Sequence, residues 1–527
     1  MHQSFDIKDV KNSNEKPSIK KALIVSIPLA LVLTFLLFFV TKGDYLTANV
    51  SYVLGEKDFV QYDTFTLSFD ENIPESYVNS ATENLQELEF KGKKRFEIVQ
   101  GGADIVLSRE LGENSQEIFS KNFIPVAHIY SLVNKMTDEN IGDFNLFVLS
   151  PLNQEFVKKE YDVDVTLLGD YEELVSKLEE SDNNIGLVGF SDLDPRTKIL
   201  EMNEGYYLDD RSASIEISFY AQLSEKVDDV ILSGLSKNID IETVDWDEEK
   251  LTKVNMGGVV AIARSLAQRM DQKGDYAYPA KEIGSFLADA DLTHVSNEVS
   301  FVDGCSVYSG MRFCSRPEYI ETLEVSGVDI VELTGNHNND FGSEYNKSSI
   351  EKYTSLGMRH FGGGLNTEDA SKILYEEVNG STIAFVGYNY YDTILGTLAL
   401  AGTDRAGANS YSVEKLRDNM TEANENADVV IDTFQFQECW SYPSTDVIYP
   451  PCYKPIAVPD QEEVFKQAID LGADIVVGTQ AHQPQTYEIY GDGVIFYGLG
   501  NLYFDQINWI GTRQGLVLSH YFYDGEY

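Results

Sequence analysis

Five short polar clusters in the second half of the chain each follow directly after an apolar run. They are rich in acidic, amide and imidazole side chains, which are the types that hydrolases use to bind divalent metal ions and to transfer protons. Such groups must converge from distant parts of the chain before they can act together. The clusters are Thr293–Ser300, Gly335–Gly342, Phe434–Trp440, Gly478–Gln485 and Gly498–Gln506.

The cluster GNHNNDFG shows the pattern most clearly. It places His337 and Asp340 three residues apart, so we expect the carboxylate to orient the imidazole through a hydrogen bond. Gly335 and Gly342 allow the backbone to turn tightly after the preceding strand. For each position taken singly, the alternative to a role in a site is that the polar residue only caps the next helix. That alternative does not explain five clusters that all fall at strand ends.

The elements that carry these clusters alternate between strands and helices from residue 252 onward. Apolar runs such as GVDIVELTG and ADIVVGTQ predict strands, and DQEEVFKQAIDLG predicts a helix. Near-continuous Val and Ile runs indicate strands that are buried on both faces, as in a layered α/β domain. Because open α/β sheets bind ligands at the carboxyl ends of their strands, we expect the five clusters to meet.

The order of the motifs in this half resembles that of the CapA capsule-synthesis proteins, the PGA_cap family. The motifs are NE, GNHxxDxG, AHQPQ and GLGNLxFDQ, within residues 252 to 520. The resemblance implies a layered α/β/β/α metallophosphatase-like fold, related to calcineurin-type phosphoesterases. It also implies a role in poly-γ-glutamate production.

The resemblance further implies roles for individual residues. The metal ligands that it implies are Glu298, Asn336, His337 and His482. The catalytic residues that it implies are His337, Asp340 and Glu438. Gln485 and Asn501 would support substrate binding, and Arg264 would meet an anionic substrate unless it is a plain surface arginine.

The chain departs from the family pattern at several of the implied metal ligands. Gly258 stands where the family has an aspartate that bridges two cations, and Thr479 and Gln480 stand where it has histidines. Two divalent ions about 3.5–4 Å apart need several anionic or imidazole ligands to offset their repulsion. We therefore expect either one divalent ion or none.

Three interpretations of this site stay open, and they leave open whether the protein is an enzyme. In the first, a reduced centre with one metal ion uses His337, His482 and a glutamate as ligands. In the second, no metal binds, a glutamate acts as base and His337 carries the proton. In the third, the cleft binds a polymer or a partner without catalysis.

The first half of the chain also predicts an α/β domain, at residues 44–240. The stretches GGADIVLSREL, FIPVAHIYSLVN and NIGLVGFSDLDPR resemble periplasmic solute-binding domains of the phosphate-binding kind. Ser108 and Arg109 would hold an anion there, or would only cap a helix. The acidic stretch DIETVDWDEEK reads as a linker to the second domain, at residues 251–527.

Residues 22–40 form an uncharged apolar stretch of the length that a transmembrane helix needs. Lysines crowd the preceding residues 1–21, so the positive-inside rule places that tail in the cytoplasm and the later domains outside the cell. The expected localisation is therefore the cell membrane, with a single pass. A cleaved signal peptide is the alternative. The fold class that we expect is α/β, with a transmembrane helix, a solute-binding-like domain and a layered α/β/β/α domain in that order.

Charge and cysteine usage narrow the partners and the compartment. With 86 acidic against 40 basic residues, the net charge of −46 excludes nucleic acid as a general partner. The cysteines fall in two close pairs, Cys305 with Cys314 and Cys439 with Cys452, which predicts two local disulfides in an oxidising compartment. A zinc site built from all four cysteines is the alternative.

These observations favour a membrane-anchored extracellular protein for capsule or poly-γ-glutamate-type polymer synthesis, attachment or processing. The expected partners are an anionic polymer or small anionic ligand, the membrane and capsule-synthesis subunits. The alternative is a non-catalytic surface receptor or scaffold that binds an anionic ligand or polymer.

Overall fold

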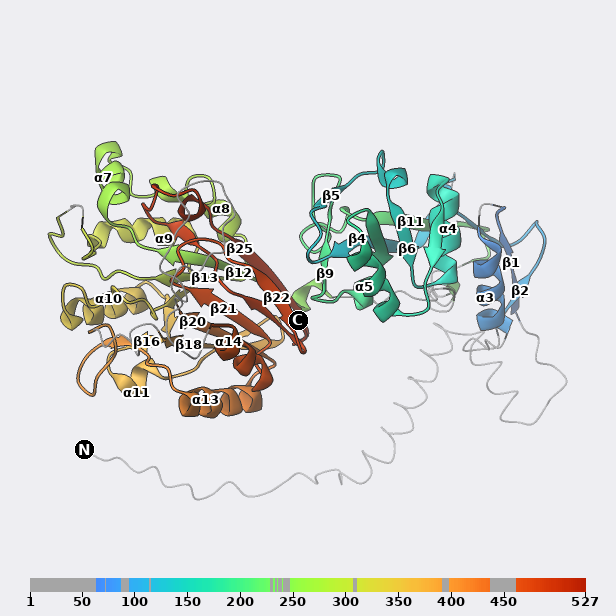
Figure 1. Cartoon of the computed structure of the whole chain (residues 1–527). Coiled ribbons are helices and arrows are strands. Elements are labelled where there is room, and N and C mark those ends of the chain that lie inside the picture. Colours follow the sequence, from blue (N-terminus) through green and yellow to red (C-terminus); the bar gives the residue numbers. More distant parts are fainter. Residues whose placement is uncertain are drawn as a thin grey trace, which may run out of the picture. The chain divides into compact units, whose positions relative to one another are not determined.

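The computed structural model describes most of the chain from residue 63 onward (Figure 1). The chain divides into two units, each described by itself below; the first comprises Met1–Ala127, Ser131–Phe190 and Ile199–Val244, and the second comprises His128–Tyr130, Ser191–Lys198 and Asp245–Tyr527. The described residues are 63–71, 73–86, 94–112, 115–227, 231, 232, 235, 239, 247–306, 310–390, 398–436 and 461–527.

The first unit is built on one mixed sheet whose strands run in the order β2-β1-β3-β11-β4-β8-β6-β7. Its strands are β1 (Asp63–Phe69), β2 (Lys94–Ile98), β3 (Ile105–Ser108), β4 (Ser115–His128), β6 (Asn145–Val148), β7 (Val165–Leu167), β8 (Asn184–Val188) and β11 (Ile215–Leu223). Its helices are α3 (Glu75–Gln86), α4 (Pro151–Tyr161) and α5 (Tyr171–Glu180). Tyr77 of α3 packs on Phe219 of β11 with ring centroids 4.9 Å apart, so this helix is fixed on the sheet by aromatic contact.

The second unit contains two six-stranded sheets. In the first sheet, β15 (Arg359–Phe361), β14 (Ile330–Glu332), β13 (Leu292–Asn297), β12 (Leu251–Val260) and β24 (Asn501–Tyr503) are parallel neighbours, and β25 (Val517–Tyr523) pairs antiparallel with β12. The second sheet has the order β17 (Leu374–Val378), β18 (Ser381–Asn389), β20 (Val429–Gln435), β21 (Ile475–Thr479), β23 (Gly493–Phe496) and β22 (Tyr487–Tyr490). Its central strands β18, β20, β21 and β23 are parallel.

An apolar layer fills the space between these two sheets. Met256 and Ile330 of the first sheet belong to the same buried cluster as Phe385 and Ile431 of the second. The outer faces are covered by α7 (Arg264–Lys273), α8 (Gly284–Leu287), α9 (Glu321–Val325) and α10 (Ser343–Ser355) on the first sheet and by α13 (Val413–Asn426) and α14 (Gln461–Asp470) on the second (Figure 1). This stacking leaves the carboxyl ends of the parallel strands as the natural edge for a site.

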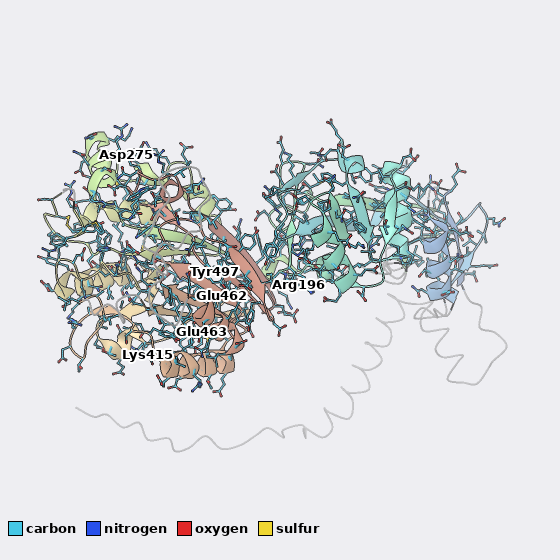
Figure 2. All side chains as sticks on the ribbon, in the orientation of Figure 1. Arg196, Asp275, Lys415, Glu462, Glu463 and Tyr497 are labelled. Atoms are coloured by element: carbon cyan, nitrogen blue, oxygen red, sulfur yellow. A yellow bond between two sulfur atoms is a disulfide. The ribbon has the colours of Figure 1, made fainter. Side chains whose placement is uncertain are left out.

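Helix α14 shows how the sequence pattern produces these layers. Val464 and Phe465 are buried against the second sheet, and Phe465 stacks on Tyr497 with ring centroids 5.5 Å apart. Glu462 and Glu463 of the same turn are exposed; Figure 2 labels both glutamates and Tyr497. Apolar and charged residues therefore alternate at the helical period, as a helix on the surface of a sheet requires.

Gly258 lies at an irregularity in β12, where the register to β13 shifts. A Cβ atom added at Gly258 would collide with the backbone oxygen of Gly500, so β12 and the segment before β24 approach too closely for any side chain here. Close backbone packing therefore explains why a glycine stands at position 258, and the sequence pattern did not show this.

The expected fold class needs correction, because it began with a transmembrane helix. No helix in the described part of the chain is long and apolar enough to cross a membrane. Residues 22–40, on which that expectation was placed, lie outside the described residues. The structure supports a mixed α/β fold with several sheets.

Candidate functional site

The candidate site lies where strands from both sheets of the second unit end. Glu298 directly follows β13, and Asn336 comes a few residues after β14. Gln435 is the last residue of β20, and Gln480 and His482 follow β21. Four polar segments from the two sheets therefore reach the same edge.

The amide of Gln435 joins these segments. Its Nε2 donates to Glu298 Oε1 at 3.1 Å and to Asn336 Oδ1 at 3.5 Å, and it also contacts Gln480 Oε1. Thr479 Oγ1 donates to Gln435 Oε1 at 3.1 Å, which fixes the amide with its nitrogen toward the three oxygens. An amide nitrogen carries two hydrogens and cannot serve three oxygens at once. The cluster thus has more acceptors than donors.

Glu298 is fully buried, and among the described residues its Oε2 has no hydrogen-bond partner. Nε2 of His482 lies 3.8 Å from that oxygen. Gly335 packs closely against Glu298, since an added Cβ would lie 2.7 Å from Glu298 Cα and 2.9 Å from its Cγ. A buried carboxylate oxygen without a partner is costly, so this position favours a proton or a cation.

His482 is held by the amide of Asn501. Asn501 Nδ2 donates to the backbone oxygens of His482 and Thr512, both at 3.0 Å, so its Oδ1 must face the ring. That oxygen lies 2.9 Å from His482 Nδ1 and accepts a hydrogen bond from it. The neutral ring therefore carries its hydrogen on Nδ1 and presents the lone pair of Nε2 toward Glu298.

His337 is held by Asp340 in the same way. Asp340 Oδ2 lies 2.8 Å from His337 Nδ1 and also accepts the backbone N–H of Phe313 at 2.7 Å. The imidazole packs on the ring of Phe313, with centroids 4.2 Å apart. Phe313 packs edge-on to Phe504, whose ring lies 5.3 Å from that of His482. Two phenyl rings thus connect the two histidines.

Arg264 stacks between these phenyl rings. Its guanidinium carbon lies 4.7 Å from the ring centre of Phe313 and 4.8 Å from that of Phe504. Its Nε donates to Asp505 Oδ1 at 2.7 Å. The structure therefore places Arg264 in the wall of the site, with its charge already paired to a carboxylate.

Three of the eight described non-glycine residues with left-handed backbone lie at this site. They are Arg264 (φ 49°), Gln480 (φ 79°) and His482 (φ 56°). Such conformations cost about 1–3 kcal/mol each and are retained mainly at functional positions. This local strain marks the loop after β21 independently of its residue types.

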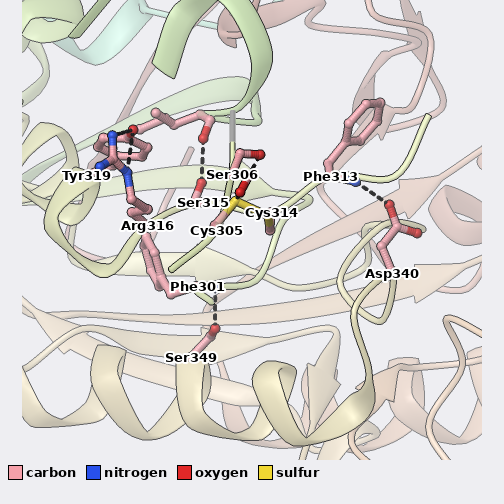
Figure 3. The surroundings of a disulfide bond; sticks show 11 residues. Phe301, Cys305, Ser306, Phe313, Cys314, Ser315, Arg316, Tyr319, Asp340 and Ser349 are labelled. Atoms are coloured by element: carbon pink, nitrogen blue, oxygen red, sulfur yellow. Dashed lines mark hydrogen bonds between the residues drawn. A yellow bond between two sulfur atoms is a disulfide. The ribbon is translucent and has the colours of Figure 1, made fainter. Parts of the chain in front are cut away.

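The remaining predicted site residues are placed as follows. Gln485 donates its backbone N–H to Gly498 O at 2.9 Å, and its buried side-chain oxygen has no hydrogen-bond partner among the residues that the structure describes. Cys305 and Cys314 form the expected disulfide (Figure 3). Glu438, Cys439 and Cys452 lie outside the described residues.

The metal ligands implied by the sequence are not all gathered at one point. Among the described residues, no group of three or more His, Cys, Asp or Glu side chains is arranged to hold a metal ion. The donors that meet are one carboxylate, Glu298, one imidazole, His482, and the amides of Asn336, Gln435 and Gln480. One carboxylate does not offset the charge of two divalent ions.

Sequence reasoning missed two members of the cluster, Gln435 and Gln480. The signal for Gln480 was present, because this residue stands where the family resemblance puts a histidine. Gln435 had no such signal beyond its place at a strand end. Both were passed over because an amide is neither a strong metal ligand nor an acid or base.

The fold and the site thus define a two-sheet α/β domain with a carboxylate, imidazole and amide cluster at its strand ends. Residues 253–506 match the model of the family described as "Bacterial capsule synthesis protein PGA_cap". This confirms the family that the motifs indicated.

Two curated relatives agree with this family. The chain is 27% identical over 289 residues to the "Capsule biosynthesis protein CapA" of Bacillus anthracis, covering 53% of this chain and 65% of the relative. It is 27% identical over 205 residues to the "PGA biosynthesis protein CapA" of Bacillus subtilis (strain 168), covering 39% of this chain and 50% of the relative. The match therefore spans less than two thirds of either relative.

The similarity to solved structures is weaker than the similarity to these two relatives. An ABC-type phosphate transport receptor from Vibrio cholerae aligns with 10% sequence identity and a TM-score of 0.23. The alignment covers 34% of this chain and 94% of the receptor chain. A score of that size carries no argument. The solute-binding fold expected for residues 44–240, with Ser108 and Arg109 at an anion, stays a prediction.

Proposed function

We propose that the second unit works in the synthesis, attachment or processing of a bacterial capsule polymer of the poly-γ-glutamate type. The match of residues 253–506 to the capsule synthesis family supports the polymer class. The disulfide between Cys305 and Cys314 supports a location outside the cytoplasm, because such bonds persist in oxidising compartments. Capsule-synthesis subunits and an anionic polymer chain are the partners that we propose.

One observation carries the proposed chemistry: Glu298 Oε2 is buried, has no hydrogen-bond partner within the described part of the chain, and lies 3.8 Å from His482 Nε2. Because Asn501 takes the Nδ1 hydrogen of His482, both facing atoms are acceptors unless one of them is protonated. The pair therefore favours holding one proton between the two groups. A carboxylate and an imidazole that face each other in this way are suited to giving and taking that proton.

The reaction class that fits this pair is acid–base catalysis at a carbonyl group. In our proposal, the Glu298–His482 pair takes the proton from a water, hydroxyl or amine as it attacks the carbonyl carbon, and returns it to the leaving atom. The amide groups of Gln435, Gln480 and Asn336 would bind the amide groups of the polymer. General acid–base catalysis of this kind typically contributes about 10²–10⁴-fold in rate.

The described residues fit a single divalent ion at most. Glu298 Oε2 and His482 Nε2 would hold it, with the amide oxygens of Asn336 and Gln480 as further donors. Such an ion would polarise a bound carbonyl group. Metal analysis of the purified protein tests this point: a stoichiometric ion that is lost in both Glu298→Gln and His482→Gln supports the ion, and its absence from active protein rejects it.

The proposed function is tested by restoring polymer production in a capsule-negative bacterium that lacks its own relative of this family. The wild-type gene is expected to restore surface polymer, and Glu298→Gln, which keeps the shape and removes the charge, is expected to fail. Glu351→Gln on the exposed face of α10 is the matched control. Full polymer production by Glu298→Gln, at equal protein level, would contradict the acid–base proposal.

A non-catalytic receptor is the second candidate, and the amide content of the cluster favours it. Gln480 stands where the family resemblance implies an imidazole, and its oxygen contacts Gln435 instead of a metal. Under this alternative, purified protein would bind poly-γ-glutamate without altering its length. Binding is measured by calorimetry and chain length by gel filtration, so turnover and simple binding are told apart.

A further inference from the structure

The disulfide loop between Cys305 and Cys314 is attached to the rest of the unit at its base. Val302 N donates to Ser315 O at 2.8 Å, and Ser315 N donates to Ser300 O at 3.0 Å. The hydroxyl of Ser315 donates to the backbone oxygen of Ile262 at 2.6 Å. The disulfide then joins the two sides of the loop, with Cα atoms 6.0 Å apart (Figure 3). The segment directly before Cys314 is thus held from both sides.

That segment contacts the loop that carries the first histidine. Phe313 N donates to Asp340 Oδ2 at 2.7 Å, as the dashed line in Figure 3 marks. Arg312 Nε donates to the backbone oxygen of Asp340 at 3.1 Å, and its guanidinium lies 4.7 Å from the ring centre of Phe341. Two consecutive residues therefore hold one short segment of the 335–342 loop.

The contact with Asp340 bears on the protonation pattern of His337. Asp340 Oδ2 accepts from both Phe313 N and His337 Nδ1, so the amide fixes the carboxylate in the orientation that the imidazole needs. The Phe313 ring, 4.2 Å from the imidazole, limits rotation of that ring. A fixed Nδ1 hydrogen leaves Nε2 as the nitrogen that can bind a proton or a ligand.

We infer that the Cys305–Cys314 disulfide is a positioning element for His337. Through Phe313 it holds Asp340 and the imidazole in one orientation, so the site is complete only when the disulfide is formed. The functional part of this inference rests on the proposed function, since the rings of Phe313 and Phe504 connect His337 to His482 of the proposed acid–base pair. The geometry of the disulfide loop is independent of that function.

The test is the tautomer of His337 in the full chain, read from the ¹⁵N chemical shifts of histidine-labelled protein. Wild type is expected to show a single Nδ1–H form for His337, assigned by its loss in His337→Gln. The double variant Cys305→Ser with Cys314→Ser is expected to show a mixture of Nδ1–H and Nε2–H forms. His482, which Asn501 holds, is the internal control and is expected to stay unchanged.

A single Nδ1–H form of His337 in the folded double variant overturns the inference, and so does an equal change at His482, which would indicate general loosening. Should the double variant not fold, Phe313→Gly keeps the disulfide and removes the ring, and it is expected to give the same mixture. One tautomer in Phe313→Gly overturns the inference as well. Because the ¹⁵N measurements need no polymer, they can contradict the inference about the disulfide whether or not the proposed function is correct.

Discussion

The two histidines of the site are oriented by different partners. His482 is buried and receives its orientation from the neutral amide of Asn501, with Glu298 facing its other nitrogen. His337 is partly exposed and receives its orientation from the carboxylate of Asp340. A carboxylate partner stabilises the imidazolium form, whereas an amide partner only selects the tautomer. The two rings are therefore suited to different steps.

Under the function proposed above, we therefore propose the central step for His482 and a supporting step for His337. The countercharge for a protonated His482 comes from Glu298 on the reactive side of the ring, so proton transfer and charge compensation occur at the same place. His337 has its countercharge behind it and keeps Nε2 open. It is suited to carrying a proton between the site and solvent.

The largest effect is expected from removing the two rings separately. We expect His482→Gln to lower polymer-forming or polymer-cleaving activity by about 10²–10⁴-fold, as for loss of a general acid–base group. His337→Gln should lower it by roughly 10–100-fold, the range for a residue that acts through its neighbours. Rates with purified protein and defined polymer measure both. Equal losses would break the comparison.

A substitution of the orienting amide is expected to have the next largest effect. Asn501→Leu removes the hydrogen bonds to His482 Nδ1 and to the backbone oxygens of His482 and Thr512. Leaving buried polar groups unpaired costs about 1–3 kcal/mol, so the unfolding midpoint in urea should fall. Asn426→Leu at the exposed end of α13 is the control. An unchanged midpoint for Asn501→Leu would show that water replaces the amide without cost.

Gly335 precedes His337 by two residues and packs against Glu298, which faces His482, so its substitution bears on both histidines. In Gly335→Ala the new Cβ would lie 2.7 Å from Glu298 Cα, which forces a backbone shift at the buried carboxylate. Overpacking of this kind costs about 1–3 kcal/mol in free energy of unfolding. In the control Gly402→Ala, the nearest atom to the new Cβ is 3.5 Å away. Similar stabilities for the two variants would contradict this packing.

The smallest effect concerns another buried histidine, His520, whose Nδ1 pairs with the Tyr527 hydroxyl at 3.0 Å. Burial, together with repulsion from His294, lowers the pKa of His520 to about 3. The unfolded chain, with a histidine pKa of about 6.5, binds a proton between these two values while the folded protein does not. Stability from neutral His520 is therefore present above about pH 6.5 and lost as the pH falls, by up to about 1.4 kcal/mol per unit.

Comparison of wild type with His520→Gln isolates that contribution, since all other titrating groups cancel. The difference in free energy of unfolding, measured in urea from pH 7 to pH 4, should shift in favour of the variant as the pH falls. A difference that is flat across this range would show that His520 is not protonated on unfolding.

The family and the chemical nature of the site were readable from the sequence. Glu298, Asn336 and His482 come from motifs more than 180 residues apart in the chain at their extremes, and strand ends were the correct guide to their meeting place. The Cys305–Cys314 disulfide followed from spacing alone. The fold class was wrong in its opening transmembrane helix, for which the described residues give no support.

The rest depended on contacts that no single sequence reveals. Arg264 was expected to meet substrate, but it pairs with Asp505, about 240 positions away, and lies over the rings of Phe313 and Phe504. The roles of Gln435 and Gln480 depend on which amide atoms face each other. The left-handed backbone at Gln480 and His482 is likewise set by packing and not by local preference.

The antiparallel pairing of β25 with β12 has a consequence for how the protein is made (Figure 1). Residues 251–260 leave the ribosome long before residues 517–523, yet they form neighbouring strands at one side of the sheet. Residues 251–257 of β12, which pair with β13 on one side, therefore lack their β25 neighbour on the other side until the last segment arrives. A nascent chain halted before residue 517 therefore exposes a long, unpaired apolar edge to chaperones and to aggregation.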